Sequence, residues 1–509
     1  MSDSYKVPDN DITIHKANEV YVQIDAERGI IKEMAEYFTF MVPGHKFNPL
    51  FKNRMWDGKI RLLNLKNQTL YFGLLSHIEE FAKDREYTIG YADSIDLKEE
   101  YSVYLAEKFY SQLDIHSRGT SITVHDYQSN AFVHFMRNRR ALIVSPTGSG
   151  KSLLCYLIAI QMHVYKQMRG LIIVPTVSLV EQLASDFIDY SSEVDLDTTE
   201  LVHKIYSGKE KHTDKAITIS TWQSLQKMDD EYFTQFDYVI GDEAHLCKSK
   251  EIKRILCACT NAGYRLGMTG TLDGTKTHKL VLEGLFGELE QFTSTKELID
   301  KKILSKFEIK CLVLKHNDDD SKEIKKKKDY KEEIAYLIKC EARNKFIKNL
   351  ALSMKNNTLV LYQYVDKHGK LLYDAISNSY NIDDRKVFYI HGGINAYERE
   401  KIRKLTEQEE NAIIVASFGT FSTGINIKNL HNIIFASPSK SRVRNLQSIG
   451  RGLRINEGKE KAVLYDIADD MRVGKYMNFT LKHFVERVKI YTEEEFLFKL
   501  YKIRLKNGS

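Results

Sequence analysis

Cysteine, proline and long apolar runs are all scarce in this chain of 509 residues. Its 6 cysteines include no Cys-x-x-Cys pair, so the spacing of a zinc framework is missing, and scattered unpaired cysteines are typical of a reducing cytosol. The 6 prolines argue against long disordered tracts. No apolar run approaches the roughly 18 residues of a membrane span, and the polar N-terminal residues carry no signal region. We therefore expect a cytoplasmic protein with no membrane partner.

A strong excess of one charge is also missing, because 75 basic residues oppose 69 acidic ones and leave a net charge of +6. This balance permits a nucleic-acid partner without requiring one. Residues 46–66 are the exception, since their basic side chains face Asp57 alone. We assign four of these side chains to phosphate contacts, which give affinity rather than sequence choice: Lys52, Arg54, Lys59 and Arg61. Trp56 in the same stretch fits a base-stacking role or a core anchor that braces the Asp57-Gly58 turn, and we favour the anchor.

The order of strand-like and helix-like segments predicts an α/β fold. From about residue 120 to 305, apolar strands alternate with helical stretches, and a second set repeats this order to about residue 470. Such alternation is typical of parallel sheets that helices cover on both faces. We predict four parts: an α/β accessory module at 1–115, α/β domains at 116–305 and 306–475, and a helical extension at 476–509.

The segment Ser145–Ser152, SPTGSGKS, joins a predicted strand to a predicted helix and has the pattern of a phosphate-binding loop. Only its first position departs, where Ser145 stands in place of glycine. Backbone N–H groups of such a loop close around phosphates, and the helix N-terminus adds the positive end of its dipole. We expect Lys151 to reach the β- and γ-phosphates and Ser152 to ligate Mg²⁺. The other residues expected to contact ATP here are Thr147, Gly148, Ser149 and Gly150; an ordinary strand–helix loop is the weaker alternative.

A second motif, Asp242-Glu243-Ala244-His245, follows an apolar strand. At the carboxyl end of a strand, Asp242 can hold Mg²⁺, and Glu243 can polarise the attacking water. His245 has no His or Cys partners at ligand spacing, so we do not assign a metal to it. An acidic surface turn is the plain alternative, but the phosphate loop upstream weakens it. Together the two motifs predict an NTPase.

Further motifs, in chain order, make the chain resemble a superfamily 2 helicase. DYQSNAF places Gln128 where this superfamily reads adenine, and PTVSLVEQ and STWQSL resemble its nucleic-acid-facing loops. TGT resembles the motif that couples hydrolysis to movement, and SFGTFSTGINIKNL and QSIGRGLR resemble the motifs of the second domain. The resemblance implies two tandem RecA-like domains that bind ATP and Mg²⁺. Closing and opening of their cleft would move one nucleic-acid strand across both domains.

Carried over residue by residue, this resemblance implies three groups of roles. The residues in contact with nucleic acid would be Pro175, Thr176, Thr221 and Thr423. The residues that couple hydrolysis to movement would be His245, Thr269, Thr271 and Gln447. The second domain would complete the ATP site with Gly424, Arg451 and Arg454, and Asn426 also matches the motif.

The segment QSIGRGLR places Gln447, Arg451 and Arg454 on one stripe of a predicted helix. It also places Gly450 and Gly452 in that helix, where each costs about 1 kcal/mol relative to alanine. A solvated basic face is the plain interpretation. We favour arginine fingers, which stabilise charge on a transferring phosphoryl group, and we interpret the two glycines as points of close approach to the first domain.

The stretch GHKFNPLFKNRMWDGKIRLLN, with YFGLL after it, resembles the UvsW helicase family of T-even phages, and the likeness spans essentially the whole chain. DEAH and TGT are plainer forms than we expect of that family, which puts no activity in doubt. The resemblance implies a monomeric ATP-dependent DNA helicase in the host cytoplasm. Its substrates would be forks, Holliday junctions, D-loops and R-loops in phage recombination, repair and replication, with single-stranded DNA and RNA–DNA hybrids among its partners. An RNA helicase, a duplex translocase and a non-catalytic binding or annealing protein are the alternatives.

Overall fold

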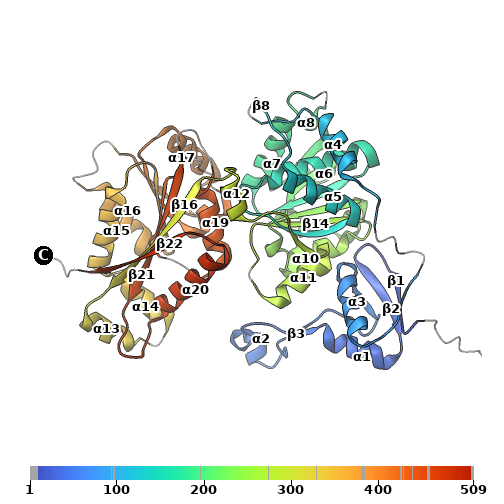
Figure 1. The fold of residues 1–509 in the computed structure, drawn as a ribbon, viewed down its shortest axis with the longest axis horizontal. Helices are drawn as coiled ribbons and strands as arrows, with labels where there is room; N and C mark the ends of the chain where they lie inside the picture. The colour runs from blue at the N-terminus through green and yellow to red at the C-terminus, as the bar shows by residue number, and fades with distance from the viewer. Residues whose placement is uncertain are drawn as a thin grey trace, which may run out of the picture. The chain divides into compact units, whose positions relative to one another are not determined.

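The computed structural model describes residues 10–92, 95, 98–117, 119–194, 196–272, 274–327, 329–379, 385–424, 427, 429–437, 440–454 and 459–505. Their contacts divide the chain into two compact units (Figure 1). The first unit comprises residues 1–145 and 150–292, and the second comprises residues 146–149 and 293–509. Each unit contains a seven-stranded sheet, and each is described by itself.

The first unit opens with a small sheet covered by helices. Its elements are β1 (Ile12–Lys16), β2 (Tyr21–Ala26), α1 (Arg28–Tyr37), β5 (Thr69–Tyr71), a 3-10 turn (Phe72–Leu74), α3 (Leu75–Asp84) and β6 (Ile89–Tyr91). The strand order is β5-β2-β1-β6, and β1 pairs antiparallel with β2 but parallel with β6. Alternate residues of β1, Ile12 and Ile14, are buried, as expected when one face of a strand meets a core.

A two-stranded ribbon interrupts this module. It consists of β3 (Thr39–Met41), a 3-10 turn (His45–Phe47), α2 (Pro49–Lys52) and β4 (Lys59–Arg61). The strands β3 and β4 pair antiparallel, with Phe40 opposite Ile60. The predicted basic stretch therefore lies mostly on this ribbon and on the segment between its strands.

The main sheet of the first unit is entirely parallel, as the alternating pattern predicts. Its elements, with those that lead into it, are α4 (Val103–Ser111), β7 (His116–Ser117), β8 (Thr120–Ser121), α5 (Asp126–Asn138), β9 (Arg140–Val144), α6 (Lys151–Lys166), β10 (Gly170–Val174), α7 (Val177–Tyr190), α8 (Thr198–Leu201), β11 (Val202–Ile205), β12 (Ile217–Thr221), α9 (Trp222–Leu225), β13 (Tyr238–Asp242), α10 (Lys250–Ala258), β14 (Tyr264–Thr269), α11 (Lys276–Phe286) and β15 (Leu289–Gln291). The strand order is β11-β12-β10-β13-β14-β9-β15. Helices α5, α6 and α7 pack in the core on one face, and α10 and α11 in the core on the other.

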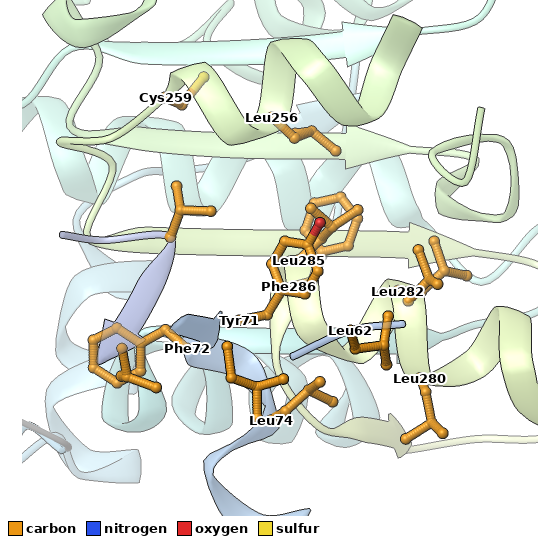
Figure 2. Packing of buried hydrophobic residues seen from close by; sticks show 14 of the residues in the cluster. Leu62, Tyr71, Phe72, Leu74, Leu256, Cys259, Leu280, Leu282, Leu285 and Phe286 are labelled. Carbon is orange, nitrogen blue, oxygen red and sulfur yellow. The ribbon is translucent and has the colours of Figure 1, made fainter. Parts of the chain in front are cut away.

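The accessory module and the main sheet share one hydrophobic core. Tyr71 and Phe72 of the module pack near Leu285 and Phe286 of α11, and all four are buried (Figure 2). Polar contacts reinforce this junction, because Arg140 pairs with Glu19 at 2.8 Å and His77 with Glu283 at 3.1 Å. The module is therefore a fixed part of the first unit.

The second unit contains another parallel sheet. Its elements are α12 (Thr295–Asp300), β16 (Lys306–Lys315), α13 (Asp318–Lys325), α14 (Tyr330–Leu337), α15 (Glu341–Ser353), β17 (Thr358–Tyr362), α16 (Lys370–Ser377), β18 (Val387–Ile390), α17 (Ala396–Gln408), β19 (Ile413–Ser417), α18 (Phe418–Gly424), β20 (Asn432–Phe435), α19 (Arg442–Gly452), β21 (Lys461–Asp470), α20 (Phe479–Glu493) and β22 (Phe498–Arg504). The strand order is β18-β19-β17-β20-β21-β16-β22. The predicted fold class, with two tandem parallel-sheet domains, is confirmed. Among the described residues, no helix is long and apolar enough to cross a membrane.

The C-terminal segment is helical only in part. The predicted helix is present as α20, but the expectation that residues 476–509 are helical throughout is wrong, because β22 follows it. This strand pairs parallel with β16 along its whole length, from Phe498 to Arg504. Backbone hydrogen bonds to a neighbouring strand outweigh the weak apolar pattern of an edge segment. The segment thus belongs to the second sheet.

Candidate functional site

Several of the segments that the sequence singled out begin or end at the carboxyl ends of neighbouring strands in the main sheet of the first unit. The strand β14 lies between β9 and β13, so Thr269 has the start of the phosphate loop on one side and Asp242 on the other. Next to β13 come β10 and β12, which lead to Pro175 and end at Thr221. Because the carboxyl ends of parallel strands meet at one edge, the predicted ATP motifs and nucleic-acid loops share that edge.

The phosphate loop has the backbone that its glycines allow. Gly148 and Gly150 have φ angles of +88° and +83°, in the left-handed region that glycine tolerates best. The helix α6 begins at Lys151 without a side-chain cap, so its first amides are not occupied by the residue that precedes it. The Lys151 ammonium donates a hydrogen bond to the carbonyl of Ser145 at 3.0 Å. The loop is thus built around backbone donors and one lysine, which is what a polyphosphate requires. Thr147 precedes the first glycine, and the buried Ser149 lies between the two.

Gln128 lies against this loop. It is buried in the first turn of α5, and its side-chain oxygen accepts a hydrogen bond from the backbone N–H of His125 at 2.9 Å. Its amide nitrogen lies so close to Gly150 that a methyl group there would collide with it. The structure therefore places Gln128 at the loop, and its predicted contact with adenine stays a prediction.

Asp242 has the properties of a residue prepared for a metal ion. Burial and the neighbouring charge of Glu243 raise the pKa of Asp242 to about 6, and the positive charge of Lys151 offsets part of this. Among the described residues, its Oδ1 atom is buried and has no hydrogen-bond partner. A buried carboxylate oxygen without a donor is costly unless a cation binds it. Ser152, on the helix after the loop, exchanges a hydrogen bond of 2.9 Å with Tyr190. Both side chains fit the donor set that Mg²⁺ prefers.

This raised pKa predicts how metal binding depends on pH. A proton competes with Mg²⁺ for Asp242, so we expect the apparent Mg²⁺ affinity of the nucleotide complex to fall about tenfold per pH unit below pH 6.

The pKa of Asp242 in the folded protein lies above its ordinary value of 3.8. This group therefore stabilises the metal-free fold most at low pH and loses that contribution as pH rises through about 6. The measurement is Mg²⁺-dependent nucleotide binding between pH 5 and 8. Asp242→Asn is the control and should lose the pH dependence; a wild-type curve flat down to pH 5 would contradict the assignment.

His245 connects the acidic motif to β14. Its Nδ1 atom lies 3.0 Å from the hydroxyl of Thr269 and 3.3 Å from Oε2 of Glu243. The same Thr269 hydroxyl donates to the carbonyl of Thr271 at 3.0 Å. Among the described residues, no group of three or more His, Cys, Asp or Glu residues could hold a metal ion. The predicted coupling residues His245, Thr269 and Thr271 are thus brought together in one hydrogen-bonded chain.

The residues predicted to contact nucleic acid after β10 and β12 are partly buried or buried. Thr176 is the N-cap residue just before α7, and its hydroxyl accepts a hydrogen bond from Leu179 N–H at 3.4 Å. Thr221 is buried, and its hydroxyl exchanges a hydrogen bond of 2.9 Å with Ser224. Pro175 is partly buried. In the exposed first turn of α7, Ser178 is a polar residue that the motif comparison passed over.

The predicted basic residues of the ribbon are exposed, but they are not equivalent. Arg61 forms an ion pair with Asp57, and this hydrogen bond lowers the pKa of Asp57 to about 2. Within the part of the chain that the structure describes, Lys52, Arg54 and Lys59 form no ion pair. Trp56 is half-buried, and its indole N–H donates to the carbonyl of Lys59 at 2.9 Å. It braces the turn as predicted, but it lies outside the core cluster, so its interpretation as a core anchor is wrong.

In the second unit, the predicted arginine helix exists as α19. Gln447 and Arg451 are partly buried on this helix, and Arg454 follows it. The Arg451 guanidinium lies 5.6 Å from the centre of the Phe421 ring of α18. A methyl group at Gly452 would collide with Ile433 of β20, in the same unit, so this glycine is a close contact to its own sheet and not to the first domain. Thr423 and Gly424 end α18, where their side-chain surroundings lie outside the description, and Asn426 lies outside the described residues.

A lysine that the motif comparison missed fixes the segment around Arg454. The Lys459 ammonium donates to the carbonyls of Gly452 at 2.5 Å and Arg454 at 2.9 Å. The Ser305 hydroxyl donates to the same Arg454 carbonyl at 3.2 Å. Burial, with the charge of Arg454, lowers the pKa of Lys459 to about 7. The sequence does not predict that Lys459 is buried, because a single lysine after the end of a helix is usually exposed to solvent.

Comparisons with known proteins agree with this geometry. The model of the N-terminal domain of the DNA helicase UvsW matches residues 11–93, that of the res subunit of type III restriction enzymes matches 121–274, and that of the helicase conserved C-terminal domain matches 341–456. The ATP-dependent DNA helicase uvsW of Enterobacteria phage T4 is 34% identical over 97% of this chain and 100% of its own length. The chain belongs to the UvsW helicase family.

Two further comparisons, one with a solved structure and one with a sequence, found similar proteins. The crystal structure of T4 UvsW matches with a TM-score of 0.51 and 31% identity, and the match covers 97% of this chain and 100% of that one. The DNA 3'-5' translocase XPB2 of Sulfurisphaera tokodaii is 26% identical over 68% of this chain and 81% of its own. The UvsW-specific match at 11–93 includes the whole basic ribbon, whereas the other two matches hold the motifs shared among helicases.

Proposed function

We propose that this chain unwinds and remodels branched DNA, namely forks, Holliday junctions, D-loops and R-loops, in phage recombination, repair and replication. The coarser activity, that of an ATP-dependent DNA helicase, follows from membership of the UvsW family. The observation that supports ATP use most directly is the Asp242 side chain, which has a buried oxygen without a hydrogen-bond partner among the described residues. It lies at the same edge of the sheet as the start of the phosphate loop. It acts as a monomer in the host cytoplasm, on branched and single-stranded DNA and on RNA–DNA hybrids.

The roles of the ATP-site residues follow from their chemistry. Ser152 and Asp242 would hold Mg²⁺, which supplies charge neutralisation for the phosphates when it is bound. Ser152 gives up its hydrogen bond to Tyr190 for this purpose. Lys151 exchanges its contact with the Ser145 carbonyl for a phosphate, and Glu243 orients the attacking water and accepts its proton. Gln128 binds adenine, and Thr147, Gly148, Ser149 and Gly150 cradle the phosphates.

Movement would come from both α/β domains, 116–305 and 306–475. Gly424, Arg451 and Arg454 complete the ATP site when the domains close. Gln447 helps to couple this closure to ATP hydrolysis. Hydrogen bonds link His245 to Thr269 and Thr269 to Thr271. Through them, a change in the position of the acidic motif would alter the loop that follows β14. Residues 1–115 add nucleic-acid contacts, and β22, within the predicted segment 476–509, forms the edge strand of the second sheet. The DNA contacts are Lys52, Arg54, Lys59, Arg61, Pro175, Thr176, Thr221 and Thr423.

The substrate assignment predicts a strong preference in a panel of nucleic acids. We expect ATP hydrolysis and strand separation to be at least about tenfold faster on forked DNA and Holliday junctions than on blunt duplex or RNA, which is a preference of about 1.4 kcal/mol in transition-state binding. Glu243→Gln on the same panel is the control for contaminating activities. A preference for RNA alone would favour the RNA-helicase alternative, and equal rates on blunt duplex and forks would favour a duplex translocase.

A further inference from the structure

The ribbon of the accessory module exposes apolar side chains that its fold does not use. Phe47 is 83% exposed, Met55 75%, Leu50 50% and Met41 47%. Single exposed apolar residues are ordinary, but four on one short segment mark an interaction surface. We name this set, Met41, Phe47, Leu50 and Met55, the apolar knuckle.

The apolar knuckle stands on a built scaffold. The side chain of Asn48 accepts a hydrogen bond from Leu50 N–H at 2.9 Å and so caps α2, and Met55 N–H donates to the carbonyl of Leu50 at 2.8 Å. The His45 ring packs edge-on against Phe51 with 4.7 Å between their centres. These contacts fix the backbone that carries the exposed side chains, which lowers the backbone entropy lost when a ligand binds.

The base of the ribbon is tied to the first unit's main body. Phe40, opposite Ile60 in the ribbon, packs against the core that the module shares with α11. The Lys276 ammonium of α11 lies 5.9 Å from the centre of the Phe40 ring. A ligand on the knuckle therefore lies on the same compact unit as Lys151.

The charges around the knuckle identify the ligand's chemistry. Lys46, Lys52, Arg54 and Lys59 alternate with its apolar residues along the chain, and all four are exposed. A partner must then offer apolar faces and negative charges at close spacing. Unpaired nucleotides have both, because each base has a face for stacking and each linkage has a phosphate, whereas a duplex hides its base faces.

We propose that the apolar knuckle binds unpaired bases where a DNA duplex opens, while Lys46, Lys52, Arg54 and Lys59 contact the neighbouring phosphates. This inference rests on the proposed function and adds a site to it. An aromatic ring and flexible thioethers suit bases of any sequence, since stacking does not depend on the hydrogen-bonding edge. The knuckle would thus separate strands without sequence preference.

The test compares Phe47→Ser/Met55→Ser with the wild-type full-length chain. Both side chains are mostly exposed, so the variant should keep the wild-type melting temperature. We expect fork binding to weaken by roughly 5- to 150-fold, the range for loss of one base–aromatic stack. We also expect the fluorescence change of 2-aminopurine at the fork junction to be lost. Tyr104→Ser, which removes an aromatic side chain that is 71% exposed on α4, is the matched control.

A second variant separates apolar from charge contacts. Lys52→Ala/Arg54→Ala should lower the slope of log affinity against log salt by about two, whereas Phe47→Ser/Met55→Ser should keep the wild-type slope. Wild-type fork binding and 2-aminopurine signal in the apolar variant would overturn the proposal. So would unchanged fork binding with lost binding to vesicles of anionic phospholipid, which would make the knuckle a membrane contact. If the wild type showed no fork preference but the apolar variant lost single-strand binding, the branched-DNA function would fail and the knuckle would stand.

Discussion

Arg454→Ala should abolish ATP hydrolysis and leave DNA binding largely intact. An arginine that reaches the transferring phosphoryl group stabilises charge that exists only in the transition state, and such a residue contributes about 10³–10⁵ in rate in other phosphoryl-transfer systems. The surrounding backbone is fixed, because Ser305 and Lys459 both donate to the Arg454 carbonyl. The substitution therefore removes the side chain without releasing the segment. The measurements are DNA-stimulated phosphate release and fork binding with a non-hydrolysable ATP analogue.

The control for this experiment lies on the same helix. Arg444 is exposed near the start of α19, so Arg444→Ala removes an equal charge from the same element. It should keep hydrolysis within about twofold of the wild type, as expected for an exposed surface substitution. Comparable losses in both variants would mean that α19 acts as a basic surface, which is the plain interpretation of its sequence. Hydrolysis in Arg454→Ala close to that of the wild type would end the arginine-finger assignment.

The sheets and the strand-end motifs could be predicted because their signals are local. Strands such as β10 and β13 are buried on both faces and therefore read as continuous apolar runs, and the loops that follow them hold the polar residues. Parallel pairing then brings these loops to one edge without further information. The same reasoning placed α19, because its stripe repeats with the period of a helix.

The features that the sequence did not predict depend on distant residues. β22 is mostly exposed, so its sequence lacks the apolar alternation of a half-buried strand, and only pairing with β16, nearly 200 residues earlier, makes it a strand. The hydrogen bond between Ser152 and Tyr190 likewise joins different helices. The close fit of Gly452 to Ile433 shows the same limit, since a helix glycine does not reveal which neighbour it approaches.

The packing of the accessory module against the main sheet was also not predicted. Its own sheet and helices were evident, but a shared core with α11 required knowing that Tyr71 and Phe72 face Leu285 and Phe286. That junction matters for function, because a module that shares a hydrophobic core with the main sheet moves with that sheet. A basic ribbon on a flexible linker would only add affinity for nucleic acid. A ribbon on a module that is packed into the core can also oppose a duplex that ATP hydrolysis moves against it.

Glu243→Gln should lower hydrolysis by about 10²–10⁴, the range for loss of a general base, and leave nucleotide binding within about twofold of the wild type. Glutamine keeps the size of the side chain, so the contact of 3.3 Å with His245 can persist as a hydrogen bond.

The backbone of Glu243 has a φ of +54°, in the left-handed region, which costs a non-glycine residue about 1–2 kcal/mol. Such strain persists where surrounding contacts over-determine it, and here the next turn supplies one, because Leu246 N–H donates to the Glu243 carbonyl at 2.9 Å. Single-turnover hydrolysis and equilibrium nucleotide binding measure the two effects separately. Asp242→Asn is the matched comparison and should instead weaken Mg²⁺-dependent nucleotide binding; if Glu243→Gln lost binding to the same extent, the two carboxylates would share the metal and the water would need another base.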